Sequence, residues 1–126
     1  DGRGPSDYSD QTFSITGGSP VVVEVSPNPV SLGESVHISV DIKDSGFSNL
    51  TKSMSVGLLS LDRSSFIPSA YATKSNSDGK WHVDFIVPAS VTTGVWMVYG
   101  ISIDDDNGVI KYFWYPYHIN KTFIIQ

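Results

Sequence analysis

The chain has 126 residues, no cysteine and a formal net charge of −5. This length suits one domain that buries about two thirds of its unfolded surface, and the lack of cysteine excludes disulfides, thiol nucleophiles and thiolate metal sites. The acidic charge repels phosphate groups and disfavours nucleic acid and anionic membranes as partners. No apolar run approaches the ~20 residues of a membrane-spanning helix, so membrane insertion is not expected either.

The first 19 residues are predicted to lie outside the main domain, which we place at residues 20–126. They are rich in Gly, Ser, Asp and Pro, a composition typical of linkers. Within them DQTFSI at residues 10–15 resembles NKTFII at residues 120–125. Residues 1–19 are therefore either a linker or the last strand of a preceding repeat, and the sequence leaves both hypotheses open.

The first strands of the domain follow the two-residue period of a half-buried sheet. Residues 21–25, VVVEV, are predicted to form a strand that ends at the prolines which follow. Residues 36–43 alternate, so one face should be buried and the other solvated. The buried face would carry Val36, Ile38, Val40 and Ile42, and the solvated face His37, Ser39, Asp41 and Lys43.

The middle of the chain is predicted to form one strand and one hairpin. Residues 54–61 form the strand, with a bulge where the apolar parity changes at Leu58–Leu59. Residues 62–69 lack a period and are expected to be irregular. The hairpin joins residues 70–74 to residues 80–87 through the turn SNSDG. Its second arm alternates at Trp81, Val83, Phe85 and Val87.

A second hairpin is the strongest local signal in the chain. Residues 94–103 and 109–115 flank the turn DDDNG, whose Asn-Gly pair suits a tight loop. The apolar parity of the first arm switches at Tyr99–Gly100. A bulge there would place Trp96 and Val98 on the same buried face as Ile101 and Ile103; the alternative is a strand buried on both faces. Residues 119–125 are the last predicted strand.

About seven to nine short strands separated by turn signals predict an all-β sandwich of two antiparallel sheets. Several motifs then resemble those of bacterial immunoglobulin-like repeat domains from secreted and cell-surface proteins. They are PNPV and GESV within residues 27–36, W-x-V-x-F-x-V-P at residues 81–88, G-x-W-x-V at residues 94–98 and I-x-I-x-D-x-N-G at residues 101–108.

This resemblance covers about residues 21–125 and implies an immunoglobulin-like sandwich in an extracellular, secreted or cell-surface protein. It implies a non-catalytic module of a larger multidomain protein, acting as a spacer, stalk or adhesive repeat. The partners implied are neighbouring domains of the same chain and a surface protein. The chain departs from the usual pattern at residues 112–117, YFWYPY, which are more aromatic than such repeats usually are.

This aromatic stretch provides the candidate ligand-binding residues. An exposed row of rings offers a flat platform for sugar rings or for a partner protein, and the residues in question are Tyr112, Trp114, Tyr115 and Tyr117. The alternative is core packing on one face and a domain contact on the other. If the rings are exposed, the second functional hypothesis applies: an ancillary carbohydrate-binding module of a secreted glycoside-active enzyme, with polysaccharide as partner.

The acidic turn provides the candidate metal site. Asp104, Asp105 and Asp106 could hold calcium, because hard cations prefer clustered carboxylate oxygens. The alternative is a solvated hairpin tip, since the spacing matches no EF-hand loop. Calcium is the one possible cofactor, and a melting temperature that rises in millimolar calcium would support the site.

The sequence carries no catalytic motif, and we expect no enzyme activity and no catalytic residue. G-x-S-x-G, H-E-x-x-H, P-loop and dinucleotide patterns are all absent from the sequence. The three histidines are scattered, so a three-histidine metal site is not favoured. His37 and His82 have the polar parity of their strands and are expected at the surface, where they can meet only if these strands are neighbours.

Overall fold

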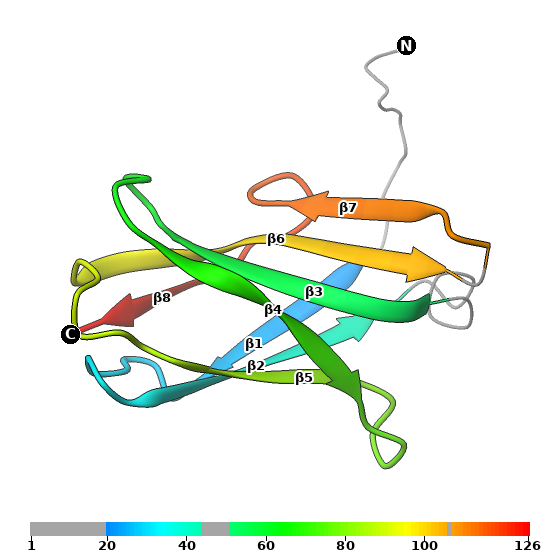
Figure 1. The fold of residues 1–126 in the computed structure, drawn as a ribbon, viewed down its shortest axis with the longest axis horizontal. Coiled ribbons are helices and arrows are strands. Elements are labelled where there is room, and N and C mark those ends of the chain that lie inside the picture. Colours follow the sequence, from blue (N-terminus) through cyan, green and yellow to red (C-terminus); the bar gives the residue numbers. More distant parts are fainter. Residues whose placement is uncertain (1–19, 44–50, 106) are drawn as a thin grey trace, which may run out of the picture.

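The computed structural model describes residues 20–43, 51–105 and 107–126, so the hypotheses for residues 1–19 concern residues outside this part of the chain. Within these ranges the chain forms eight β-strands and no helix (Figure 1). The strands are β1 (Val21–Ser26), β2 (Ser35–Ile42), β3 (Thr51–Ser60), β4 (Phe66–Lys74), β5 (Trp81–Ile86), β6 (Gly94–Asp105), β7 (Ile110–Trp114) and β8 (Thr122–Ile125).

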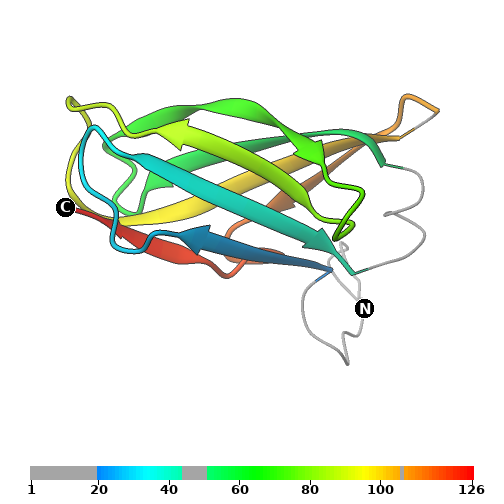
Figure 2. The same cartoon turned by 90° about the horizontal axis from the view of Figure 1, so that it is seen from below.

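The strands form two antiparallel layers that pack face to face (Figures 1 and 2). One layer contains β1, β2 and β5, and the other contains β3, β6 and β7, with β8 pairing along the first part of β6. Strand β4 joins the layers, because its first part pairs with β3 while Thr73 and Lys74 pair with β5. Since β2 lies beside β5 and β3 beside β6, the connectivity is that of an immunoglobulin-like sandwich. The predicted fold class is confirmed.

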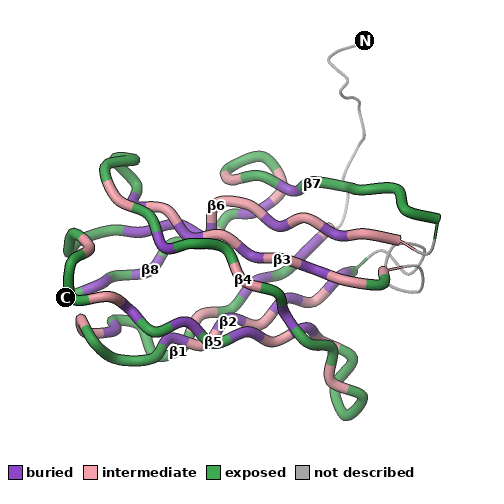
Figure 3. The backbone as a smooth tube through the Cα atoms, in the orientation of Figure 1, coloured by how far each residue is buried: buried purple, intermediate pink, exposed green. Residues whose placement is uncertain are grey.

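The core lies between the two layers and is built from every second residue of the strands. The burial pattern of β2 alternates as predicted, and Figure 3 shows buried positions recurring along each strand. Ile38, Phe85 and Trp96 are 0%, 5% and 0% exposed. The Trp96 indole nitrogen also donates a hydrogen bond of 2.9 Å to the carbonyl of Thr92. Apolar burial from both layers therefore seals one interior without any crosslink.

The bulge predicted in the 94–103 arm is present in β6. Gly57 of β3 pairs with Gly100, and the next residue, Leu58, pairs with Val98, so Tyr99 is the extra residue. The bulge resets the period, and as a result Val98 and Ile101 are both buried on the core side. The alternative of a strand buried on both faces holds for the part of β6 before the bulge, where Trp96, Met97 and Val98 are all buried. From the bulge onward only one face is buried, because Tyr99, Gly100 and Ser102 are partly exposed.

Three local predictions are wrong. Strand β3 keeps its alternation through Leu58, so it has no parity change, and Ser60 is buried at 3% exposure. This hydroxyl is tolerated inside because it donates to Asp62 and accepts the backbone N–H of Ser65. The segment expected to be irregular begins β4 at Phe66, and the last strand is shorter than predicted, starting at Thr122.

The turn between β3 and β4 carries a carboxylate that should make folding pH dependent. Asp62 accepts hydrogen bonds from the hydroxyl and the backbone N–H of Ser64, at 2.7 and 3.0 Å, and from the hydroxyl of Ser60 at 2.8 Å. These bonds, the Ser64 hydroxyl first, lower the pKa of Asp62 below its ordinary value of 3.8. The ionised form therefore stabilises the fold above that value, and the contribution is lost as pH falls below it.

We predict that Asp62→Ala lowers the melting temperature at pH 7, and that the difference from wild type shrinks as the pH is lowered through 4 toward 3. Thermal unfolding of both proteins across this range measures it. A difference that stays constant down to pH 3 would show that the charge of Asp62 has no part in stabilising the turn.

Candidate functional site

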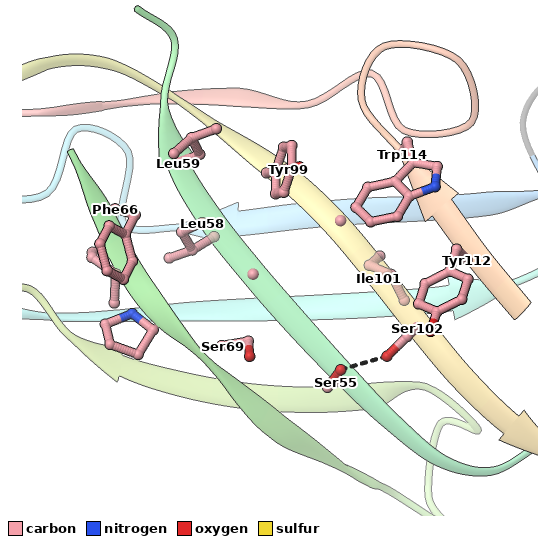
Figure 4. A pocket seen from close by; sticks show the side chains of 14 residues that line it. Ser55, Leu58, Leu59, Phe66, Ser69, Tyr99, Ile101, Ser102, Tyr112 and Trp114 are labelled. Atoms are coloured by element: carbon pink, nitrogen blue, oxygen red, sulfur yellow. Dashed lines mark hydrogen bonds between the residues drawn. The ribbon is translucent and has the colours of Figure 1, made fainter. Parts of the chain in front are cut away.

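A groove crosses the solvent-facing side of the layer that contains β4, β3, β6 and β7 (Figure 4). Its volume is about 580 Å³, within the range usual for small-molecule sites. Four ring side chains surround a floor that contains two glycines, and two serines lie at its edge. We call this surface the aromatic groove; its rings are Phe66, Tyr99, Tyr112 and Trp114, its floor glycines are Gly57 and Gly100, and its edge serines are Ser55 and Ser102.

Strand geometry explains how two rings of the aromatic stretch reach the groove. Successive side chains of a strand point to opposite faces, so Tyr112 and Trp114 share the outer face of β7 while Phe113 is buried in the core at 5% exposure. The rings of Tyr112 and Trp114 are nearly parallel, with an interplanar angle of 8° and centroids 5.6 Å apart. Two residues that are two positions apart in one strand thus supply two rings to the same face.

The bulge in β6 adds a third ring. Tyr99, the extra residue, lies on the outer side of β6, where its ring is 5.3 Å from that of Trp114 at an angle of 56°. The guanidinium of Arg63 lies 5.8 Å from the centre of the Tyr99 ring, a favourable cation–π distance. The bulge thus keeps the β6 core residues inside and at the same time supplies a wall of the groove.

Glycine at position 100 creates the space for the Trp114 indole. The two residues are cross-strand partners, and a Cβ at Gly100 would lie 2.8 and 3.0 Å from two ring carbons of Trp114. Gly57, the partner of Gly100 on the other side, is less crowded, because a Cβ there would meet its nearest atoms at an ordinary 3.8 Å. The floor is therefore open on both strands, but only Gly100 is required by the ring above it.

We predict that Gly100→Ala displaces the Trp114 indole, whereas Gly57→Ala leaves it in place. Near-ultraviolet circular dichroism, which reports the packing of aromatic rings, should change in the first variant and stay close to wild type in the second. Equal spectra for the two variants would mean that the floor does not position the ring.

The polar part of the groove is a pair of hydroxyls. Ser55 and Ser102 are cross-strand partners whose oxygens lie 2.6 Å apart, and Figure 4 shows the bond at the edge of the groove. One hydroxyl donates to the other, so the acceptor keeps a hydrogen that it can donate outward. Flat apolar rings beside hydroxyl donors suit a ligand with apolar faces and polar edges, and sugar rings have this shape.

The four predicted ligand-binding residues divide into two pairs. Tyr112 and Trp114 line the groove, whereas Tyr115 and Tyr117 lie beyond the end of β7 and do not line it. Tyr117 is 81% exposed, and the backbone N–H of Tyr115 donates to the carbonyl of Tyr99. Binding by any of the four remains a prediction.

Sequence reasoning did not identify Tyr99 or Phe66 as part of the site. For Tyr99 a signal existed, because the predicted bulge already turns this residue outward.

The acidic turn closes the β6–β7 hairpin. Asp105 accepts backbone hydrogen bonds from Asn107 and Val109 at 2.8 and 2.9 Å, which fixes the turn. One carboxylate oxygen of Asp104 is buried and has no hydrogen-bond partner among the described residues. Asp106 lies outside the described residues. No described group of three or more His, Cys, Asp or Glu is arranged to hold a metal ion, and calcium binding at this turn remains a prediction.

Comparisons with known proteins identify likenesses in structure. No family model matches the sequence, and no curated protein sequence matches it. Cwp6 from Clostridium difficile matches with a TM-score of 0.56 at 16% identity, over 77% of this chain and 14% of that protein. Salmonella alpha-2-macroglobulin reacted with methylamine matches with a TM-score of 0.50 at 12% identity, over 90% of this chain and 7% of that one.

The described part of the chain contains no helix that could cross a membrane. The chain spans only 14% and 7% of the lengths of the two proteins that it matches. At these identities the likeness concerns the fold alone, which is an immunoglobulin-like β-sandwich.

Proposed function

We propose that the chain is a non-catalytic immunoglobulin-like module of a larger extracellular or cell-surface bacterial protein, where it acts as a spacer, stalk or adhesive repeat. The structural likeness to short parts of two longer bacterial proteins supports this proposal. So does the resemblance of its strand motifs to bacterial repeat domains.

The observation that carries the proposal is the position of the two ends of the domain. Strand β1 starts toward one end of the long axis and β8 finishes at the other (Figure 2). The hydrogen bonds agree, because Lys43, after the end of β2, donates to Pro20, whereas Gln126 bonds with Val30 and Leu32, just before the start of β2. Modules whose two ends lie at opposite ends of the long axis extend a chain when they are joined end to end, instead of folding it back.

Small-angle scattering of one copy and of two copies in tandem tests this role. We expect the maximum dimension of the tandem to approach twice that of the single copy. A compact tandem would contradict the spacer role.

A second function is favoured by the aromatic groove. We infer that the groove binds carbohydrate, as an ancillary binding module of a secreted glycoside-active enzyme would. Phe66 and Tyr112 expose 65% and 54% of their surface, and Trp114 exposes 39%. Exposed rings that converge on one groove mark a binding surface more clearly than rings scattered singly, and the hydroxyl pair at the edge provides the polar contacts that such a ligand needs.

A glycan array, followed by affinity electrophoresis in gels that contain neutral polysaccharides, tests this second function. Retardation by at least one polysaccharide would support it. If neither the array nor the gels detect binding, the carbohydrate role is excluded and the spacer role remains.

A further inference from the structure

The outer face of the other layer carries a chain of four side chains that neither proposed function uses. Strands β2 and β5 are neighbours, so the two surface histidines that were predicted to meet only under this condition do meet. Nε2 of His37 lies 2.9 Å from Nδ1 of His82. A carboxylate extends this row of side chains at each end, since Nδ1 of His37 lies 2.8 Å from Asp84, and Nε2 of His82 lies 2.9 Å from Asp78.

The two carboxylates determine which nitrogen of each imidazole carries hydrogen. An ionised carboxylate only accepts hydrogen bonds, so Nδ1 of His37 and Nε2 of His82 must both donate. The pKa of Asp78 is lowered, mainly by the backbone N–H of Lys80 and also by His82, which keeps this carboxylate ionised. If both imidazoles were neutral, the two nitrogens that face each other would both present lone pairs.

The geometry makes this conflict direct. The ring centres are 5.0 Å apart, close to the largest separation that a 2.9 Å contact between ring nitrogens allows. The two nitrogens thus lie nearly on the line between the rings. With no proton between them two lone pairs repel each other, and with two protons two N–H groups collide, whereas a single proton makes an N–H···N bond of ordinary length.

We propose that His37 and His82 share one proton, so that Asp84, His37, His82 and Asp78 form a charged hydrogen-bonded clamp that is complete only when one of the two imidazoles is protonated. The clamp joins β2 to β5 and to the turn between β4 and β5. In the unfolded chain nothing holds these four side chains together, so the imidazoles of His37 and His82 titrate independently near pH 6.5.

The stability that the clamp contributes should therefore pass through a maximum. Stability changes with pH according to the difference in bound protons between the unfolded and folded chains. Above pH 6.5 the unfolded pair holds less than one proton and the folded pair holds one, so stability falls as the pH rises. Below pH 6.5 the unfolded pair holds more than one, so stability falls as the pH drops. The maximum lies near pH 6.5, where the unfolded pair carries one proton on average.

The size of the effect follows from the same proton count. While the folded pair keeps one proton, the clamp's contribution to the folding equilibrium constant is reduced about threefold at one pH unit from the maximum and about 25-fold at two. These are upper limits, because His37 and His82 are partly exposed to solvent.

The other charged groups around the clamp are carboxylates and lysine ammonium groups. Glu24 of β1 is the cross-strand partner of Ser39, which separates it from the clamp. Asp41 and Lys43 form an ion pair of 2.9 Å with each other. Lys74 and Lys80 flank the turn that holds Asp78. The third histidine, His118, follows β7 in the other layer.

The test compares the 126-residue chain with the His37→Gln/His82→Gln double variant by urea unfolding from pH 4.5 to 8.5. Titration of His118 is common to both proteins and cancels in the difference. We expect the difference in unfolding free energy to be bell-shaped with its maximum near pH 6.5. A flat or monotonic difference would overturn the proposal.

A second measurement keeps the proposal testable if the double variant does not fold. The ¹⁵N shifts of the wild-type imidazoles at pH 6.5 should show Nδ1 of His37 and Nε2 of His82 protonated. The two facing nitrogens should show values between those of protonated and bare nitrogen. Spectra of two neutral or two fully protonated rings would exclude a shared proton.

Discussion

Replacing Trp96 with alanine is expected to lower the free energy of unfolding by about 3–5 kcal/mol. The side chain is fully buried, and its strand position pairs with Ser60 of β3 on one side and Phe123 of β8 on the other. The substitution leaves a cavity where three strands meet and removes the donor that satisfies the Thr92 carbonyl. Urea unfolding at neutral pH, followed by circular dichroism, measures the loss.

Val95→Ala is the matched control for this substitution. Val95 is the preceding residue of the same strand, but its side chain is 42% exposed on the other face. We expect a loss below about 1 kcal/mol, since only strand propensity and partial burial change. Comparable losses in the two variants would mean that Trp96 is not central to the core.

Replacing Trp114 with alanine is expected to weaken carbohydrate binding about 30-fold or more. Truncating a central aromatic contact in a binding surface typically costs about 2 kcal/mol or more, which corresponds to this ratio. The substitution removes a ring that is in contact with both Tyr112 and Tyr99, so the ordered wall of the groove is lost as well. Calorimetric titration with the polysaccharide identified by the screen measures the change.

Tyr117→Ala is the control for the groove. It belongs to the same aromatic stretch and is 81% exposed, but it does not line the groove. Its affinity should stay within about twofold of wild type, the change expected for a contact outside the central surface. Binding that is lost in Tyr117→Ala and kept in Trp114→Ala would move the site to the turn after β7.

The fold was predictable because the alternation of residue types follows directly from strand geometry. Strand β2 shows the simplest case, and the Tyr99 bulge could be inferred because the apolar residues on either side of it have opposite parity. The same rule failed in β3, where Ser60 points inward at a position that its sequence assigns to solvent. The hydroxyl is satisfied by the turn that follows, and this compensation depends on three-dimensional contacts.

The candidate sites could be predicted only in part, since they combine strands that are far apart in sequence. Parity alone placed Tyr112 and Trp114 on one face. Phe66 joins them because β4 lies beside β3, and no local sequence pattern predicts this pairing. The pairing of His37 with His82 likewise depends on β2 lying beside β5, a feature of the sandwich topology.

The last strand has a consequence for how the domain would respond to tension. The segment around Val30 runs parallel to β8, with hydrogen bonds of 2.9 Å from Val30 to Ile124, 2.9 Å from Gln126 to Val30 and 3.0 Å from Leu32 to Gln126. A pull on the two ends of the domain would drive these segments past each other along their length. The bonds would then be loaded together in shear instead of opening one after another, which is the arrangement that best resists mechanical rupture.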